Sequence, residues 1–248
     1  MLNGKRIVIT GANGGIGNSI CEIFLKNNAK LVLLYNNNRD NIDQLLKNYK
    51  NYKSNVEIFQ VDLLNDSQLQ NTANSIISTN NIDGIVHCVT LPIVYKNFLQ
   101  KTWKDYQMNI ELQTKSFLQL VRYLIPSMKK QNHGKIINIL SSVVVGKPIS
   151  GVSDYIVGKY SLLGLSKALS TELGPFNINV NCISPSMTNT PLIENFPSKL
   201  KEITISQTPL GRIGEKDDVA SLALFLCSNY SNYITGENIL LTGGQTMY

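Results

Sequence analysis

The sequence has few of the residue types that bind metals or form disulfides. Its 248 residues include four cysteines, which are scattered without a CxxC pair, and two histidines. This scarcity argues against a metal site and a disulfide framework, and it predicts packed thiols in a reducing compartment. His87 ends an apolar run and could contact a ligand, but no nucleophile accompanies it, so we interpret it as structural.

Long apolar runs and clustered charges are also missing. No apolar run approaches the ~18 residues that a membrane helix needs. Lys5 and Arg6 lead directly into a short apolar strand, which is not the pattern of a secretory leader. The net charge is +6, but no stripe interleaves the lysines with aromatic residues. We therefore expect a cytoplasmic protein that binds neither membranes nor nucleic acid. The alternative use of the positive charge is attraction to an anionic cofactor or an acidic carrier.

Length and composition fit one large α/β domain. A chain of 248 residues with 43% hydrophobic content can bury a full core, and no low-complexity linker or internal repeat divides it. We predict a single domain over residues 1–248. Residues 184–208 are rich in Pro, Ser, Thr and Asn and follow the end of a predicted strand, where ligands bind in such sheets. This stretch is therefore expected to form a mobile loop or a small helical lid over the site.

Short aliphatic runs alternate with helical periodicity along the chain. Seven runs are typical of buried parallel strands. They cover residues 6–10, 30–35, 56–61, 82–88, 135–141, 178–183 and 238–241. Between them apolar residues recur at helical spacing, for example at Phe117, Leu120, Val121 and Leu124. The alternation predicts a doubly wound parallel sheet of the Rossmann type, with about seven strands and helices on both faces.

A glycine-rich turn follows the first predicted strand, at residues 10–17 with the sequence TGANGGIG. Gly11 permits a tight turn, Gly15 lets the backbone approach a phosphate, and Gly17 allows close packing of the helix that follows. That helix presents unpaired N–H groups and the positive end of its dipole. The turn therefore predicts a binding site for the pyrophosphate of a dinucleotide.

Tyr155 and Lys159 lie four residues apart, and so on one face of a predicted helix. A free tyrosine has a pKa near ~10, which is too high for proton exchange at neutral pH. We expect the Lys159 ammonium to favour the phenolate and so lower the pKa of Tyr155. Together with a dinucleotide site, such a pair indicates hydride transfer between a carbonyl and an alcohol, with Tyr155 as general acid and base.

The TGxxxGxG spacing and the Tyr-x-x-x-Lys pair resemble the short-chain dehydrogenase/reductase family, and the resemblance runs from the first strand to the carboxyl terminus. It implies a catalytic tetrad of Asn109, Ser142, Tyr155 and Lys159, with Ser142 placed 13 residues before Tyr155. Ser142 would donate a hydrogen bond to the oxygen that Tyr155 protonates. The resemblance also implies that Lys159 holds the nicotinamide ribose and that Asn109 positions a water.

The same resemblance implies a set of residues that hold the cofactor, with Asp62 near the adenine and Thr190 near the nicotinamide carboxamide. The set comprises Gly11, Asn13, Gly14, Gly15, Ile16, Gly17, Asn36, Arg39, Asp62, Leu63, Cys88, Tyr155, Lys159, Pro185, Thr188 and Thr190. The family's usual Asn-Asn-Ala-Gly after the fourth strand is replaced by His87, Cys88, Val89 and Thr90, so the backbone beside the nicotinamide is expected to shift.

The end of the second strand indicates which cofactor is used. An NAD site usually has a carboxylate there to hold the ribose 2′-hydroxyl. This chain has Asn36 and Arg39, and no carboxylate precedes Asp40. Amides and a guanidinium can accept a 2′-phosphate that an acid would repel, so NADP(H) is favoured over NAD(H). The alternative is that Arg39 is solvated and the site uses either cofactor.

The chain looks most like 3-oxoacyl-[acyl-carrier-protein] reductases, which implies reduction of a carbonyl, with a 3-oxoacyl thioester as one candidate substrate. Lys129 and Lys130 would suit an acyl carrier protein, but Phe176 stands where a second basic docking residue is expected. A sugar, polyol or other small-alcohol dehydrogenase is the second hypothesis, and a nucleotide-sensing or scaffold protein without chemistry is the third. The resemblance also implies a homotetramer, although the sequence leaves a dimer open.

Overall fold

The seven predicted strands pair into one parallel sheet. In the computed structural model, which describes residues 1–247, the strand order is β3-β2-β1-β4-β5-β6-β9. The strands of this sheet are β1 (Arg6–Thr10), β2 (Lys30–Tyr35), β3 (Val56–Gln60), β4 (Gly84–His87), β5 (Gly134–Ile139), β6 (Ile178–Pro185) and β9 (Asn238–Leu241). The prediction of a doubly wound α/β sheet is therefore confirmed, with strand ends that differ from the predicted ones by one or two residues.

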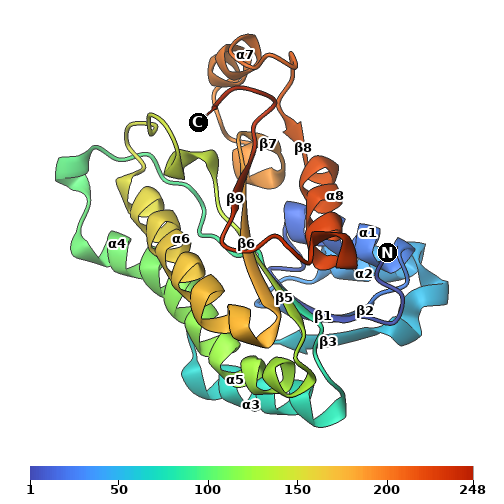
Figure 1. Cartoon of the computed structure of the whole chain (residues 1–248). Coiled ribbons are helices and arrows are strands. Elements are labelled where there is room, and N and C mark those ends of the chain that lie inside the picture. The colour runs from blue at the N-terminus through green and yellow to red at the C-terminus, as the bar shows by residue number, and fades with distance from the viewer. Residues whose placement is uncertain (248) are drawn as a thin grey trace.

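Helices cover both faces of the sheet, as Figure 1 shows. The helices are α1 (Gly15–Lys26), α2 (Asp40–Asn48), α3 (Asp66–Thr79), α4 (Trp103–Ile110), α5 (Ser116–Gln131), α6 (Ser153–Leu173), α7 (Ser198–Ser206) and α8 (Lys216–Cys227). Helices α3, α5 and α6 bury their apolar stripes on one face, and α1, α2 and α8 do so on the other. No helix within residues 1–247 is long and apolar enough to span a bilayer.

Alternation along each strand divides the core into two layers. In β1, Val8 packs into the layer beneath α3 and α5, whereas Ile7 and Ile9 pack into the layer beneath α1 and α8. All three side chains are at most 1% exposed. Neighbouring residues of a strand point to opposite faces, so a continuous apolar run is what a sheet covered on both sides requires.

One helical run is interrupted by a π turn. Helix α4 continues through a π-helical segment (Glu111–Lys115) directly into α5. Such turns insert one extra residue into a helix and often occur at functional sites. Here the π turn brings Gln113, a fully buried residue, against the sheet and α6.

The predicted lid region contains more regular structure than a mobile loop. After β6 the chain forms β7 (Thr188–Asn189), a 3₁₀ turn (Pro191–Ile193) and α7. Strand β7 pairs in parallel with β8 (Gly214–Glu215), a short pairing that the sequence pattern did not predict. The segment therefore folds as a small, partly helical unit that begins at the carboxyl end of β6.

Candidate active site

Two adjoining cavities open at the carboxyl ends of the strands. The smaller, of about 150 Å³, is bordered by Tyr155 and Lys159, and the larger, of about 780 Å³, follows the glycine-rich turn. They meet near Cys88, which lines both and follows β4 directly. Strand order reverses between β1 and β4, and this switch point is where doubly wound sheets bind ligands.

The larger cavity fits a dinucleotide. Gly11 has a φ of +65°, and a Cβ there would lie 2.1 Å from the Cys88 carbonyl oxygen. A Cβ on Gly17 would lie 2.2 Å from the Gly11 carbonyl oxygen, so both positions require glycine. Helix α1 begins after Gly14 without a side-chain cap and without an acidic residue in its first turn, so its positive end remains available to an anion.

Asn13 lines the larger cavity and joins the glycine-rich turn to α2. Its Oδ1 accepts the backbone N–H groups of Asn41 and Ile42, at 3.0 and 3.2 Å, which ties the glycine turn to the start of α2. Asn36 lines the cavity, as predicted, whereas Arg39 does not. Its guanidinium is paired with Asp43 at 2.6 Å on the exposed surface of α2.

The remaining residues of the predicted cofactor set come together at the two cavities. Those lining the larger cavity are Gly11, Asn13, Gly14, Gly15, Ile16, Gly17, Asn36, Asp62, Leu63, Cys88 and Thr190. Those lining the smaller cavity are Ile16, Cys88, Tyr155, Lys159, Pro185, Thr188 and Thr190. Sequence reasoning missed Tyr35, Asn41 and Val61 of the larger cavity, which lie at the ends of β2 and β3 and in α2 and carried no motif of their own.

Tyr155 and Lys159 share one face of α6, but their electrostatics differ from the expectation. The Lys159 Nζ lies 5.6 Å from the centroid of the Tyr155 ring and donates to the Ile139 carbonyl oxygen at 2.9 Å. Burial raises the pKa of Tyr155 to about 12 and lowers that of Lys159 to about 8. The prediction of a lowered Tyr155 pKa is therefore wrong for the chain alone, because desolvation outweighs an ammonium that lies beside the ring.

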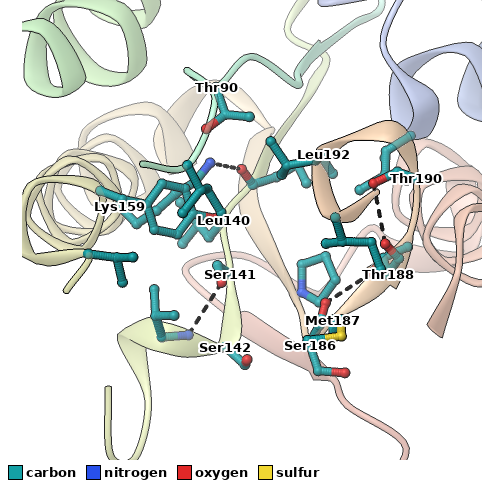
Figure 2. Close-up of a pocket in the computed structure, with 18 of the residues that line it drawn as sticks. Thr90, Leu140, Ser141, Ser142, Lys159, Ser186, Met187, Thr188, Thr190 and Leu192 are labelled. Carbon is teal, nitrogen blue, oxygen red and sulfur yellow. Dashed lines mark hydrogen bonds between the residues drawn. The ribbon is translucent and has the colours of Figure 1, made fainter. Parts of the chain in front are cut away.

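Two adjacent serines reach the smaller cavity (Figure 2), and they relate differently to Tyr155. A hydrogen bond from Ser141 lowers the pKa of Tyr155 and so opposes part of the rise caused by burial. Ser142, the residue predicted from the 13-residue spacing, makes no such contact. Both serines follow β5, which ends at Ile139, and both line the smaller cavity.

Asn109 lies behind the pocket and not in it. Its Nδ2 donates to Asp154 Oδ2 and to the Asp105 carbonyl oxygen, each at 3.2 Å, and its Oδ1 accepts from Gln113 at 3.0 Å. A Cβ on Gly158 would lie 2.9 Å from Gln113 Nε2 and 3.1 Å from Asn109 Cβ, so both side chains press against α6. The structure thus assigns Asn109 a place between helices α4 and α6, outside the lining of either cavity.

The lysines suggested for docking a carrier protein lie near the amino ends of the strands, on the side of the sheet opposite the cavities. Lys129 and Lys130 end α5, just before β5 begins, whereas the cavities follow the carboxyl ends of the strands. The Lys129 Nζ also sits 4.2 Å above the centroid of the Phe176 ring, in a cation–π contact. Within one chain, these lysines therefore do not flank the pocket.

Comparison with known proteins gives matches over nearly the whole chain. A family model described as enoyl-(acyl carrier protein) reductase matches residues 11–246. A 3-oxoacyl-[acyl-carrier-protein] reductase of Thermotoga maritima is 31% identical, with 98% of each chain covered. A 3alpha-hydroxysteroid dehydrogenase of Mediterraneibacter gnavus is 30% identical, with 98% of this chain and 97% of the relative covered. The solved structure of YwfH, an NADPH-dependent reductase of bacilysin biosynthesis, superposes with a TM-score of 0.90 at 25% identity, over 99% of this chain and all of that one.

The fold, the paired cavities and these matches define an NAD(P)-dependent oxidoreductase with a Rossmann-type sheet. The chain belongs to the short-chain dehydrogenase/reductase family. Within that family it is similar along its length to 3-oxoacyl-[acyl-carrier-protein] reductases.

Proposed function

We propose that this protein reduces a carbonyl group to a secondary alcohol with NADPH. The observation that carries the proposal is the convergence of Tyr155, Lys159 and Ser141 on an apolar cavity that adjoins a dinucleotide groove. The bound nicotinamide supplies the hydride. The chain supplies the proton, the orientation of the carbonyl and the exclusion of water.

Tyr155 is the proposed proton donor. With a pKa of about 12 its hydroxyl is protonated at neutral pH, which is the form that reduction needs. The Lys159 ammonium, held by the Ile139 carbonyl, adds positive charge on the side where the alkoxide develops. These features favour reduction over oxidation for the chain as it stands.

We further propose that Ser141 takes the role predicted for Ser142. Its contact with Tyr155 allows it to donate a hydrogen bond to the same carbonyl oxygen that Tyr155 protonates. Ser142 then belongs to the pocket wall. Asn109 supports α6 from behind through its hydrogen bonds with Asp154 and Gln113 and does not contact the substrate.

The lining of the smaller cavity favours an apolar acyl or cyclic carbonyl. Lys159 is its one charged residue, and most of the lining is aliphatic, aromatic or thioether. Its apolar members include Ile93, Tyr95, Val143, Ile149, Val152, Met187, Leu192, Ile193 and Phe196. The rings of Tyr95 and Phe196 pack edge to face, with their centroids 5.5 Å apart. This contact joins the segment after β4 to the expected lid at residues 184–208. Such a chamber offers a free sugar few hydrogen-bond partners.

NADPH is the proposed cofactor. Asn36 lines the cavity at the end of β2, where an NAD site usually has a carboxylate, and Asp62, the one carboxylate in the lining within residues 1–247, follows β3 instead. The NADPH dependence of YwfH supports the same choice.

We also propose a homo-oligomer, with a tetramer expected. Exposed apolar side chains gather on α4, α5 and α6 at Trp103, Met108, Leu118, Val157 and Tyr160. Sedimentation equilibrium should give a multiple of the 27.6 kDa chain mass, and a monomer at micromolar concentration would contradict this proposal.

The function is tested by following oxidation of NADPH and NADH against a panel of oxoacyl thioesters, cyclic ketones, quinones and sugars. We expect NADPH-dependent turnover of an apolar ketone or an oxoacyl thioester. Tyr155→Phe should lower kcat at least about 100-fold while dinucleotide binding persists, because it removes the proton donor alone. Tyr233→Phe is the control, since the Tyr233 side chain is exposed and lines neither cavity. Wild-type kcat in Tyr155→Phe would overturn the assignment.

The two serines form a natural pair of variants. Ser141→Ala should lower kcat by about tenfold to 100-fold, as loss of a hydrogen bond to a developing oxyanion does, whereas Ser142→Ala should stay near wild type. The reverse result would restore the assignment made from sequence spacing.

A further inference from the structure

His87 lies at the centre of a buried hydrogen-bond chain that joins two walls of the site. It is the last residue of β4, where its register partners are Thr10 of β1 and Asn138 of β5. The side chain is buried, and its ring centroid lies 5.2 Å from that of Phe117 on α5. The sequence indicates a structural histidine but does not indicate what the ring holds in place.

Its hydrogen bonds fix the tautomer of the ring. The Nε2 atom lies 3.1 Å from the Gln113 carbonyl oxygen, which can only accept, so Nε2 carries the proton. Nδ1 then accepts from the Thr10 hydroxyl at 3.0 Å, and the oxygen of that hydroxyl accepts the Cys88 N–H at 3.1 Å. Burial and the nearby charge of Lys159 lower the pKa of His87 to about 3, so the ring stays neutral at ordinary pH.

From Gln113 the chain continues to the helix that carries Tyr155. Gln113 Nε2 donates to Asn109 Oδ1 at 3.0 Å, and Asn109 Nδ2 donates to Asp154 Oδ2 at 3.2 Å. Lys101 Nζ donates to the other oxygen of Asp154 at 2.5 Å, and the Lys101 side chain is 1% exposed. Gln113 Oε1 is buried and has no hydrogen-bond partner among the described residues, so the side chain of Gln113 is held by the bond from Nε2 to Asn109, while its backbone carbonyl bonds to His87.

The two ends of this chain are functionally distinct. Cys88 borders both cavities, beside the proposed nicotinamide position, whereas Asp154 immediately precedes Tyr155 in α6. Among residues 1–247, His87 is the one side chain that bonds to both Thr10 on the sheet and the Gln113 carbonyl in the π turn. Strand β5 also reaches α6 directly, through the Lys159–Ile139 and Asn138–Ser166 bonds, so His87 adds the link that runs through the π turn and α4.

We propose that His87 is a positioning residue, which sets the separation between the cofactor-side backbone at Cys88 and the Tyr155 hydroxyl. The inference rests on the proposed function, in which hydride and proton reach one carbonyl from these two sides. A displacement of about 1 Å between reacting groups can lower the rate roughly 100-fold, so a link that fixes the distance between the two sides of the site preserves turnover. His87 itself transfers no proton in this scheme.

The kinetic test uses variants that break the link at two places. His87→Phe keeps a flat ring beside Phe117 but removes both hydrogen bonds, and Thr10→Val removes the hydroxyl that bridges Cys88 and His87. Each should lower kcat for the panel's best substrate by about 10- to 100-fold, with the dinucleotide Kd changed by less than about threefold. Thr10→Ser, which keeps the hydroxyl, should restore most of the loss. The kcat of the double variant His87→Phe/Thr10→Val should be no lower than that of the slower single variant, because both substitutions break the same link.

A spectroscopic test needs no substrate. With two histidines in the chain, ¹⁵N-histidine labelling gives two imidazoles, and His133→Gln assigns them. We expect the His87 ring to show a protonated Nε2 and a bare Nδ1 throughout the accessible pH range. Thr10→Val should move the Nδ1 signal, whereas Thr10→Ser should leave it in place.

The outcomes separate this inference from the proposed function. If Tyr155→Phe abolishes turnover but folded His87→Phe and Thr10→Val keep wild-type kcat, His87 only stabilises the fold and the inference fails alone. An Nδ1-protonated ring, or one that titrates near its ordinary pKa, would also overturn it. If His87→Phe does not fold, Thr10→Val carries the kinetic test. Wild-type turnover in Tyr155→Phe would instead remove the proposed function.

Discussion

His87 makes the stability of this protein sensitive to acid in a way that can be calculated. Its pKa is about 3 in the folded chain, because of burial and the Lys159 charge, against an ordinary value of 6.5 in the unfolded chain. Above the unfolded value both states hold a neutral ring, and His87 contributes no pH dependence. As the pH falls below 6.5, the His87 ring is protonated in the unfolded chain but stays neutral in the folded chain, so the free energy of unfolding decreases.

The size of the effect follows from the linkage between proton binding and folding. Between the folded and unfolded pKa values of His87, each pH unit lowers the free energy of unfolding by about 1.4 kcal/mol. Lowering the pH from about 7 to about 5 therefore removes roughly 2 kcal/mol. Total stabilities are typically about 5–15 kcal/mol, so the protein stays folded and the loss remains measurable. Urea unfolding followed by circular dichroism at the two pH values gives this difference directly.

A variant without the titrating ring isolates the contribution of His87 from that of the carboxylates. His87→Phe should be less stable than wild type near neutral pH, because two hydrogen bonds are lost, yet its loss on acidification should be smaller by about 2 kcal/mol. His133 is half-buried and its pKa is also lowered, so His133→Gln should show a change in the same direction but smaller. Equal losses in His87→Phe and wild type would refute the reasoning.

Three further changes test other parts of the molecule. Gly11→Ala should weaken dinucleotide binding and lower the Tm, because φ is +65° and the new Cβ would overlap the Cys88 carbonyl; unchanged affinity in titration calorimetry would contradict this. Lys101→Met should cost about 3 kcal/mol in urea unfolding, because the Asp154 carboxylate loses the cation that pairs with it and keeps only the Asn109 amide, whereas exposed Lys104→Met should be neutral. Asn36→Asp should weaken NADPH binding by about tenfold relative to NADH through repulsion of the 2′-phosphate, and an unchanged ratio of the two Kd values would exclude Asn36 from that contact.

Much of the fold could be predicted because each buried strand carries a distinct pattern. The continuous apolar runs located all seven strands, and the glycine-rich turn after β1 located the switch point of the sheet. The short pairing of β7 with β8 could not be predicted, because two-residue strands leave no periodicity to detect. The same limit applies to the 3₁₀ turn at Pro191–Ile193.

The site was harder to predict where a spacing in the sequence had to replace the three-dimensional positions of the side chains. Counting 13 residues back from Tyr155 selects Ser142, whereas in the structure Ser141 and Ser142 both line the smaller cavity, and a spacing alone does not distinguish two adjacent serines. The pKa of Tyr155 depends on how much water the pocket excludes, a tertiary property that a four-residue spacing does not contain. Asn109 has the right residue type, but its neighbours on α6 draw its side chain away from the cavity.

The segment from Thr190 to Phe196 borders both cavities, and a Cβ on Gly15 would meet the Thr190 side chain at 2.9 Å. The glycine-rich turn and the segment that lines the smaller cavity are thus in van der Waals contact. A dinucleotide bound at the glycine-rich turn would therefore contact the same segment that lines the smaller cavity with Leu192 and Phe196. Turnover should accordingly follow an ordered sequence, in which the nucleotide arrives first and departs last.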